Sequence, residues 1–253
     1  MRALIFAMIA AAALAACAST TQAPPPAAVT ADAPHIIAAL ADERRPQADR
    51  ARDANRRPAD MLAFAGVRPG MRVGELIAGG GYFTRIFAVA VGDEGRLFVV
   101  QRPSQPNATQ EPPVLAVAAQ YANTTVLRQF YGEMTFPEPL DVVWTSQNYH
   151  DAHITRFGLD PAAINRRAFA ALRPGGVYIV LDHAAQDGSG LRDVDSLHRI
   201  DAASVRAEVE AAGFVFDGES NALRNSADAR TLSVFDESLR GHTDQFVLRF
   251  RRP

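Results

Sequence analysis

The chain has 253 residues, of which 48% are hydrophobic, and its formal net charge at pH 7 is −2. This length and composition suffice for one substantial α/β core, and the near-neutral charge gives no support to a nucleic-acid partner. All 26 cationic side chains are arginine, so lysine-dependent mechanisms such as Schiff-base chemistry or a P-loop are excluded.

The first 16 residues have the pattern of a signal peptide, with a positive start, an apolar core and small residues before Cys17. The run Leu14-Ala15-Ala16-Cys17 resembles the lipobox of bacterial lipoproteins, in which the cysteine becomes the lipidated first residue. An ordinary signal peptide with a stray cysteine is the alternative, but Cys17 is the only cysteine in the chain. Ala18 and Ser19 do not resemble an inner-membrane retention signal, so we expect an outer-membrane lipoprotein facing the periplasm.

Three further segments are predicted after the signal peptide. Residues 17–34 carry the lipidated cysteine and a disordered tether rich in alanine and proline. Residues 35–57 form an N-terminal helical segment, and residues 58–253 form the main α/β domain. The arginine-rich piece 48–55 is usually a solvated helix face; the alternative is a lid that lays an arginine over a ligand site.

The stretch from Val73 to Thr84 predicts a strand, a tight glycine turn and a helix. The apolar strand carries Glu75, breaks at Gly79-Gly80-Gly81 and continues through Tyr82 into an apolar helix. Glycines let the backbone approach a ligand closely, and the start of the helix presents free N–H groups. The turn is therefore predicted to bind a nucleoside-containing cofactor, with a tightly packed structural turn as the alternative.

Strands and helices alternate along the rest of the chain. Strands are predicted at 96–101, 124–131, 140–145, 177–181, from 213 onward and at 245–251, and helices at 114–122, 160–172 and 201–212. This alternation predicts right-handed crossovers and a doubly wound, Rossmann-like, mainly parallel sheet.

Polar residues follow several of these strands, and the carboxyl ends of parallel strands share one edge of a sheet, where ligands bind. Gln101 follows the second strand, Asn148, His150 and Asp151 follow the fourth, and His183 follows the fifth. We predict that His150 or His183 accepts a proton and that Asp151 fixes an imidazole tautomer, although each could be structural. Gln101 and Asn148 are predicted to contact the cofactor through their amides.

Other site chemistries lack their motifs. His153 and His198 lie in the same strand-end loops, but no H-E-x-x-H or comparable spacing exists, so no metal site is predicted. A serine hydrolase would need G-x-S-x-G, which the loop 188–190 does not supply. A nicotinamide enzyme would need G-x-G-x-x-G and an acid about 20 residues later, and both are missing.

Several motifs together resemble class I S-adenosylmethionine-dependent methyltransferases, and more narrowly a group of exported bacterial predicted methyltransferases. They are Glu75 with Gly79 to Tyr82, Leu172 to Gly176, Ala212 to Phe214, Arg52 to Pro58, Asn148 to Asp151, Asp182-His183, His198 to Asp201 and Thr243 to Leu248. The chain departs from the wider family at Ile77, where a glycine is usual, and at Gln101, where an acid is usual.

This resemblance implies a seven-stranded sheet with an antiparallel last strand, and S-adenosylmethionine bound over Gly79 to Gly81. It also implies methyl transfer to a small molecule. The alternative function is a non-catalytic envelope protein of the same fold that binds a nucleoside-like or acidic small molecule, because fold does not determine function.

Overall fold

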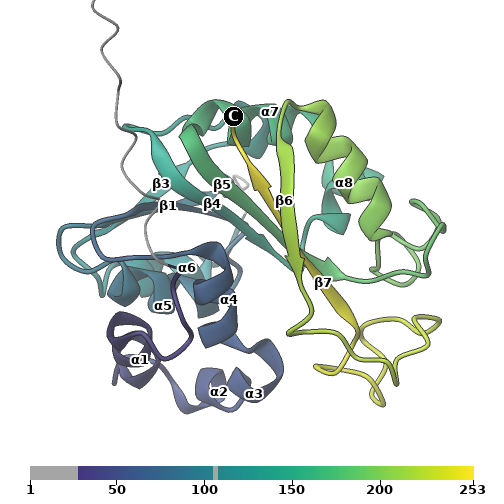
Figure 1. The fold of residues 1–253 in the computed structure, drawn as a ribbon, viewed down its shortest axis with the longest axis horizontal. Helices are drawn as coiled ribbons and strands as arrows, with labels where there is room; N and C mark the ends of the chain where they lie inside the picture. The colour runs from purple at the N-terminus through teal and green to yellow at the C-terminus, as the bar shows by residue number, and fades with distance from the viewer. Residues whose placement is uncertain (1–27, 105–107) are drawn as a thin grey trace, which may run out of the picture.

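The computed structural model describes residues 28–104 and 108–253 (Figure 1). The predicted signal peptide, Cys17 and most of the predicted tether lie outside these residues. Val29 and Ala33, at the described end of the tether segment, pack against the hydrophobic core. In the part of the chain that is described, no helix is long and apolar enough to cross a membrane.

A seven-stranded sheet in the order β3-β2-β1-β4-β5-β7-β6 forms the centre of the molecule. Its strands are β1 (Arg72–Leu76), β2 (Arg96–Gln101), β3 (Thr124–Arg128), β4 (Leu140–Ser146), β5 (Leu172–His183), β6 (Val215–Ser220) and β7 (Gln245–Arg251). β7 runs antiparallel to both β5 and β6, whereas the first five strands are parallel. The predicted doubly wound sheet with an antiparallel last strand is confirmed.

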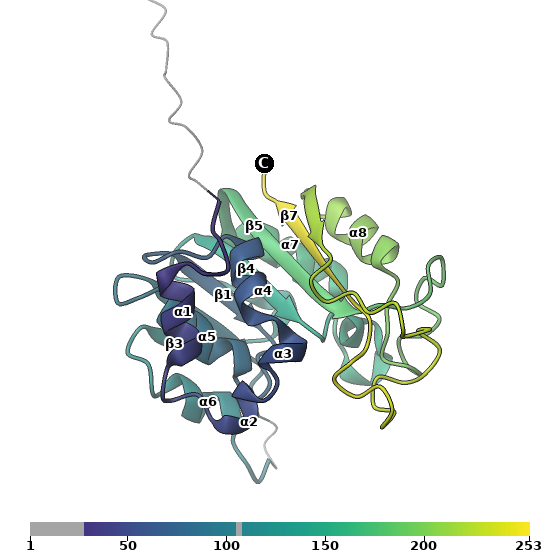
Figure 2. The same ribbon diagram turned by 60° about the horizontal axis from the view of Figure 1, so that its bottom comes forward.

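Helices cover both faces of the sheet and bury one hydrophobic cluster under each. One face carries α1 (Pro34–Ala41), α4 (Pro58–Ala65), α5 (Tyr82–Ala90) and α6 (Pro113–Ala118) (Figure 2). The other carries α7 (Pro161–Ala171) and α8 (Ala202–Ala211). Successive side chains of a strand point to opposite faces of the sheet, so neighbouring residues of the central strands belong to different clusters. Trp144, for example, lies in the first cluster and Val143 in the second.

The arginine-rich piece differs from its prediction as a single helix. It forms two short helices, α2 (Gln47–Arg50) and α3 (Asp53–Arg56), and Arg57 then takes a left-handed conformation with φ of 45° before α4 begins. The residue before a proline is disfavoured in the right-handed helical region, and Arg57 precedes Pro58. The chain therefore turns between α3 and α4, and α3 can lie over the edge of the sheet.

Short 3-10 turns follow two of the strands: η1 (Tyr131–Glu133) follows the edge strand β3, and η2 (His150–His153) and η3 (Thr155–Phe157) follow the central strand β4. η2 holds the predicted His150 and Asp151 directly after β4. The loop from 184 to 201 reaches η2 through His198, which contacts His150. The loop from 221 to 244 follows β6, contains no strand or helix, and contacts the first loop through Phe235 (Figure 1). These segments carry the residues that complete the site.

Candidate functional site

The glycine turn after β1 is built from left-handed residues. Gly79 and Gly81 have φ of 57° and 78°, and Ile77 has φ of 52°, which is unfavourable for a β-branched side chain. A Cβ added to Gly81 would lie 2.9 Å from the Val117 side chain, whereas one added to Gly80 would meet no atom within 4 Å. Gly81 is therefore required by the turn, and Gly80 leaves open space above it.

A cavity of about 310 Å³ lies at this open space, at the carboxyl ends of β1 and β4. Its lining comprises Arg52, Arg56, Glu75 to Gly80, Tyr82, Phe83, Trp144 and Ser146 to Asn148. Five of the predicted cofactor residues thus lie around one cavity: Glu75, Gly79, Gly80, Tyr82 and Asn148. Gly81 is not among the lining residues; it is the next residue of the turn and immediately precedes α5. Gln101 does not line it; its amide donates to the carbonyl of Arg102 instead, at 3.3 Å.

Glu75 and Arg56 give the cavity its electrostatic character. Glu75 is buried, and Thr84 Oγ1 donates a hydrogen bond of 2.5 Å to it. Burial raises the pKa of Glu75 to about 7, although this hydrogen bond and the charge of Arg56 act in the opposite direction. Burial, with the like charge of Arg52, lowers the pKa of Arg56 to about 10, so Arg56 is still a cation at neutral pH. The cavity accordingly carries an excess of positive charge.

The segment carrying Arg52 and Arg56 is held over the glycine turn by an ion pair between the buried Arg45 and the half-buried Asp53. Arg45 donates to Asp53 at 2.5 Å, and Tyr82 donates its hydroxyl to the same carboxylate at 2.6 Å. The Arg56 guanidinium lies 4.7 Å from the Tyr82 ring centroid and donates to the Gln147 side chain. Arg52 of the piece 48–55 lines the cavity, as the lid interpretation expects, while Arg50 and Arg52 are also exposed to solvent, as the solvated-face interpretation expects.

Two polar atoms in the cavity lining have no hydrogen-bond partner within the described residues. They are the indole Nε1 of Trp144, whose side chain is fully buried, and the hydroxyl of Ser146. Buried polar groups normally have partners, so an unpaired donor at a cavity is suited to a ligand. Asn148, by contrast, is fully engaged: it donates to the Ile77 carbonyl at 2.9 Å and accepts from Thr145. Asn148 thus ties the end of β4 to the glycine turn.

The predicted catalytic residues form a second group, beside the cavity and continuous with it through residues 146–148. His150 is buried, and Asp182 receives a 2.8 Å hydrogen bond from its ring Nδ1 and another from its backbone N–H. Burial opposes the charged imidazolium, but the Asp182 carboxylate outweighs it and raises the pKa of His150. Asp182, not Asp151, therefore occupies the position predicted to fix the tautomer of His150.

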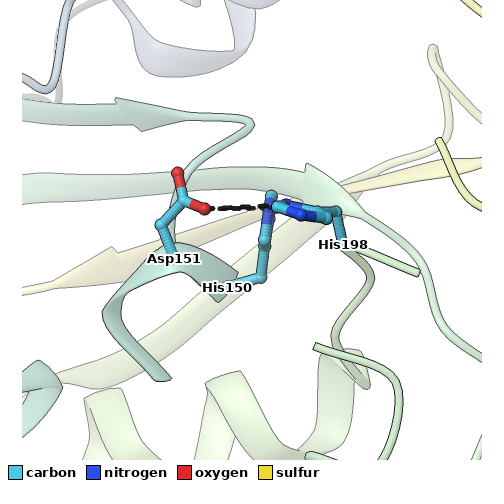
Figure 3. A group of neighbouring side chains, drawn as sticks. All are labelled: His150, Asp151 and His198. Atoms are coloured by element: carbon cyan, nitrogen blue, oxygen red, sulfur yellow. Dashed lines mark hydrogen bonds and ion pairs between the residues drawn. The ribbon is translucent and has the colours of Figure 1, made fainter. Parts of the chain in front are cut away.

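The remaining ring nitrogen of His150 faces two other side chains (Figure 3). His150 Nε2 lies 3.2 Å from His198 Nδ1 and 3.3 Å from an oxygen of Asp151. His198 comes from the loop after β5, 48 residues away in sequence. The spacing rules that gave no metal site therefore did not test this cluster, because the fold brings it together from two loops.

His183 lies on the other side of Asp182. Its Nδ1 is 2.7 Å from the hydroxyl of Thr243, and its ring is 6.1 Å from that of His150. Burial lowers the pKa of His183 to about 4 against the opposing effect of Asp182, so the ring is neutral at pH 7. His153, on the far side of η2, is 3.1 Å from Glu208 and belongs to neither group.

Sequence reasoning missed Arg56, Trp144 and Ser146 as cavity residues and did not group His198 with His150. The Arg-Asp-x-x-Arg-x-Pro motif was a signal for Arg56, since it marked this segment as part of the resemblance. Trp144 and Ser146 are the residues immediately before and after Thr145 in β4. The alternation of a strand predicts which face their side chains occupy but gives no reason to expect unpaired donors there.

No family model matches the sequence, and no curated protein matches it. Solved structures do match the fold. A methyltransferase dependent on S-adenosylmethionine from Aquifex aeolicus has a TM-score of 0.55 at 15% identity, over 80% of this chain and 93% of its own. The cyclase SpnF has a TM-score of 0.57 at 16% identity, over 84% of this chain and 85% of its own.

A third similar structure is 1,6-didemethyltoxoflavin-N1-methyltransferase of Burkholderia thailandensis, solved with 1,6-didemethyltoxoflavin and S-adenosylhomocysteine. Its TM-score is 0.53 at 17% identity, over 79% of this chain and 78% of its own. At such identities the likeness shows the fold alone, which is that of the class I S-adenosylmethionine-dependent methyltransferases.

Proposed function

We propose that the chain is an S-adenosylmethionine-dependent methyltransferase that acts on a small molecule. The observation that carries the proposal is the cavity over the glycine turn, at the carboxyl ends of β1 and β4 of a methyltransferase fold. Ligands of doubly wound sheets bind at this place, where the strand order reverses. The Aquifex and Burkholderia methyltransferases support the same assignment by their fold.

The cavity residues fit the chemical groups of S-adenosylmethionine. The guanidinium groups of Arg52 and Arg56 suit its carboxylate. Gly80 has no side chain and open space above it, so a nucleoside can approach the backbone closely there. Glu75 suits an ammonium or hydroxyl group, and the free indole N–H of Trp144 suits any acceptor of the ligand. When bound, the cofactor supplies an electrophilic methyl group, and the enzyme mainly aligns it with the acceptor.

Proton removal from the acceptor is assigned to the histidines after β4 and β5. His183 is assigned this role because its Nε2 has no partner within the described residues and can accept a proton, although a pKa of about 4 makes it a weak base at pH 7. Both ring nitrogens of His150 face other side chains, so His150 and Asp151 act in this proposal by shaping the acceptor end of the site. Asn148 links that end of the site to the glycine turn by donating a hydrogen bond to the Ile77 carbonyl.

Calorimetry on the full chain with S-adenosylmethionine and S-adenosylhomocysteine tests the cofactor. Arg56→Ala is expected to weaken binding about 10- to 100-fold, the scale of one charge-assisted hydrogen bond. Arg44→Ala is the matched control, because Arg44 is exposed and pairs with Asp42 away from the cavity. No heat from the wild-type protein with either ligand at high micromolar concentration would refute the proposal.

His183→Ala is expected to lower turnover about 10²-fold, the usual scale for losing general acid–base help. His150→Ala is expected to have at least as large an effect, because it removes the partner of Asp182. His153→Ala is the control and should retain full turnover. Transfer of a labelled methyl group to a panel of hydroxyl and amine acceptors measures all three. Equal losses in the His153 and His183 variants would contradict the assignment.

The second candidate is a non-catalytic protein of this fold that binds a nucleoside-like or acidic small molecule. It is favoured by Gln101, a neutral residue that lies outside the cavity lining where the wider family has an acid. The positive cavity would suit an acidic ligand equally well. Mass spectrometry of the small molecule that co-purifies with the protein separates the two: a ligand without S-adenosylmethionine or its product would favour this candidate.

We further propose that the protein is anchored to the outer membrane through a lipidated Cys17 and faces the periplasm. The lipobox-like sequence and the absence of any second cysteine support this. Two or more acyl chains give stable anchoring, so Cys17→Ser is expected to move the protein from the membrane to the soluble fraction. A variant that still pellets with membranes, together with a wild type that never incorporates a labelled fatty acid, would disprove the anchor.

A further inference from the structure

We propose that His150, Asp151 and His198 form a binding site for one divalent transition-metal ion, with Asp182 holding His150 in position. The site lies beside the cofactor cavity and does not depend on the proposed methyl transfer. Its three donor atoms are His150 Nε2, His198 Nδ1 and a carboxylate oxygen of Asp151, and all lie within 4.8 Å of one another (Figure 3).

The separations of these atoms match a metal's coordination sphere. Ligands about 2.1 Å from a metal, at angles between tetrahedral and octahedral, lie about 3.0–3.4 Å apart. His150 Nε2 is 3.2 Å from His198 Nδ1 and 3.3 Å from Asp151. The third separation, from His198 Nδ1 to Asp151, is 3.8 Å and needs only a few tenths of an ångström of closure.

The hydrogen bonds of His150 direct its Nε2 toward the other two donor atoms. The Asp182 carboxylate is fully buried and accepts from His150 Nδ1, so Nε2 is the nitrogen that faces His198 and Asp151. A proton on one of these atoms can link only one pair of them through a hydrogen bond, whereas a metal ion can bind all three.

Asp182 also completes the pattern expected around a metal-binding histidine, whose second ring nitrogen usually donates to a carboxylate. His198 is fixed from the opposite side. It has a left-handed φ of 55°, its ring packs edge-on against Phe235, and the next residue, Arg199, is fully buried and bonded to the carbonyls of Ala184 and Leu232. The strained backbone at His198 is thus held in place by its neighbours.

The ligand set determines which ions fit. Two imidazoles and one carboxylate select first-row transition metals such as Zn²⁺, Fe²⁺ or Co²⁺ over Mg²⁺, and three protein ligands leave positions open for water or a substrate oxygen. Arg156, the nearest cation on η3, would oppose a metal, but it is itself paired with Asp195. His198 and Asp151 are partly exposed, at 17% and 27% of their side chains, so an ion can reach the site from solvent.

Metal titration of the tag-free full chain, stripped by a chelator, tests this site. We expect one Zn²⁺ or Co²⁺ per chain with micromolar or tighter affinity, and visible absorption bands of the Co²⁺ form. His198→Ala removes a direct ligand and Asp151→Asn replaces a carboxylate ligand by a neutral amide, so each is expected to weaken binding about 100-fold or more. Removing a residue that only hydrogen-bonds to a ligand typically costs about 10- to 100-fold. His153→Ala is the matched control and should bind as the wild type does, since it lies on the same 3-10 turn but contacts Glu208.

Both His198→Ala and Asp151→Asn are tested because either substitution could disturb folding. Circular dichroism shows which of the two variants is folded. Absence of any one-to-one ion at 100-fold excess of Zn²⁺ and Co²⁺ would overturn the proposal. So would a folded His198→Ala protein with wild-type affinity, or a preference for Mg²⁺. Because these measurements involve no S-adenosylmethionine, they can fail while the proposed methyltransferase function stands, and the reverse also holds.

Discussion

Gly81→Val is expected to destabilise the domain by about 3 kcal/mol or more, while Gly80→Val leaves the fold intact and abolishes cofactor binding. Gly81 has φ of 78°, and a side chain there would meet Val117 at 2.9 Å, so strain and overpacking add. At Gly80 a side chain meets no protein atom within 4 Å and enters the cavity instead. Urea unfolding measures the first effect, and calorimetry with S-adenosylmethionine measures the second.

Gly70→Val separates strain from overpacking and is the control for Gly81→Val. Gly70 has φ of 82° but nothing within 4 Å of an added Cβ, so its variant should lose only the part due to strain. Gly81→Val within 1 kcal/mol of the wild type would contradict the structural role of that glycine. Wild-type affinity in Gly80→Val would show that the ligand does not lie over the turn.

The fold could be predicted because each element carries its own local signal. Asp160 and Asp201 cap α7 and α8 by accepting hydrogen bonds from the backbone N–H groups of Ala163 and Ala203, a role that aspartate commonly has at the N-cap position of a helix. The strands at 96–101 and 245–251 have their predicted bounds, since apolar runs between turn residues mark them. The alternation predicted a mainly parallel sheet, and the family resemblance supplied its seven strands and the antiparallel β7, whereas the strand order comes from the structure.

The site could be predicted only where its residues follow a strand directly. Glu75, Gly80 and Asn148 meet because parallel strands end at one edge. Arg56 and His198 reach the same region from a lid and from a loop 48 residues beyond His150, and no local pattern encodes such contacts. The metal-ligand spacing rules do not address this cluster for the same reason: they describe residues that are close in sequence, whereas His150 and His198 come from two loops.

Ile77 shows how a departure from the family pattern is accommodated. It stands where a glycine is usual and takes a left-handed conformation, with φ of 52°, that glycine adopts without strain. This conformation costs roughly 1–2 kcal/mol for a residue with a side chain. The Ile77 side chain packs against the second hydrophobic cluster, and its carbonyl accepts from Asn148 at 2.9 Å. The strain is thus offset by contacts that also position the loop after β4.

Glu75→Gln is expected to change how stability depends on pH. In the folded protein burial raises the pKa of Glu75 to about 7, from an ordinary value of 4.5 for a solvated glutamate. The unfolded chain therefore ionises first as pH rises, so wild-type stability falls between pH 4.5 and 7 and is level above pH 7. A difference of about 2.5 pKa units corresponds to about 3 kcal/mol. Glutamine does not ionise and can still accept from Thr84, so the variant lacks this fall.

Urea unfolding of both proteins from pH 4 to 8 measures this effect as a difference, in which other titrating groups cancel. The free energy of unfolding of Glu75→Gln minus that of the wild type should rise by about 3 kcal/mol between pH 4.5 and 7 and then level off. Glu219→Gln, an exposed acid on β6, controls for the loss of one charge. A flat difference, or one that falls with pH, would mean that Glu75 is ionised in the folded protein. The cavity would then carry a negative charge beside Arg56 at neutral pH and would suit a cationic group of the ligand at that position.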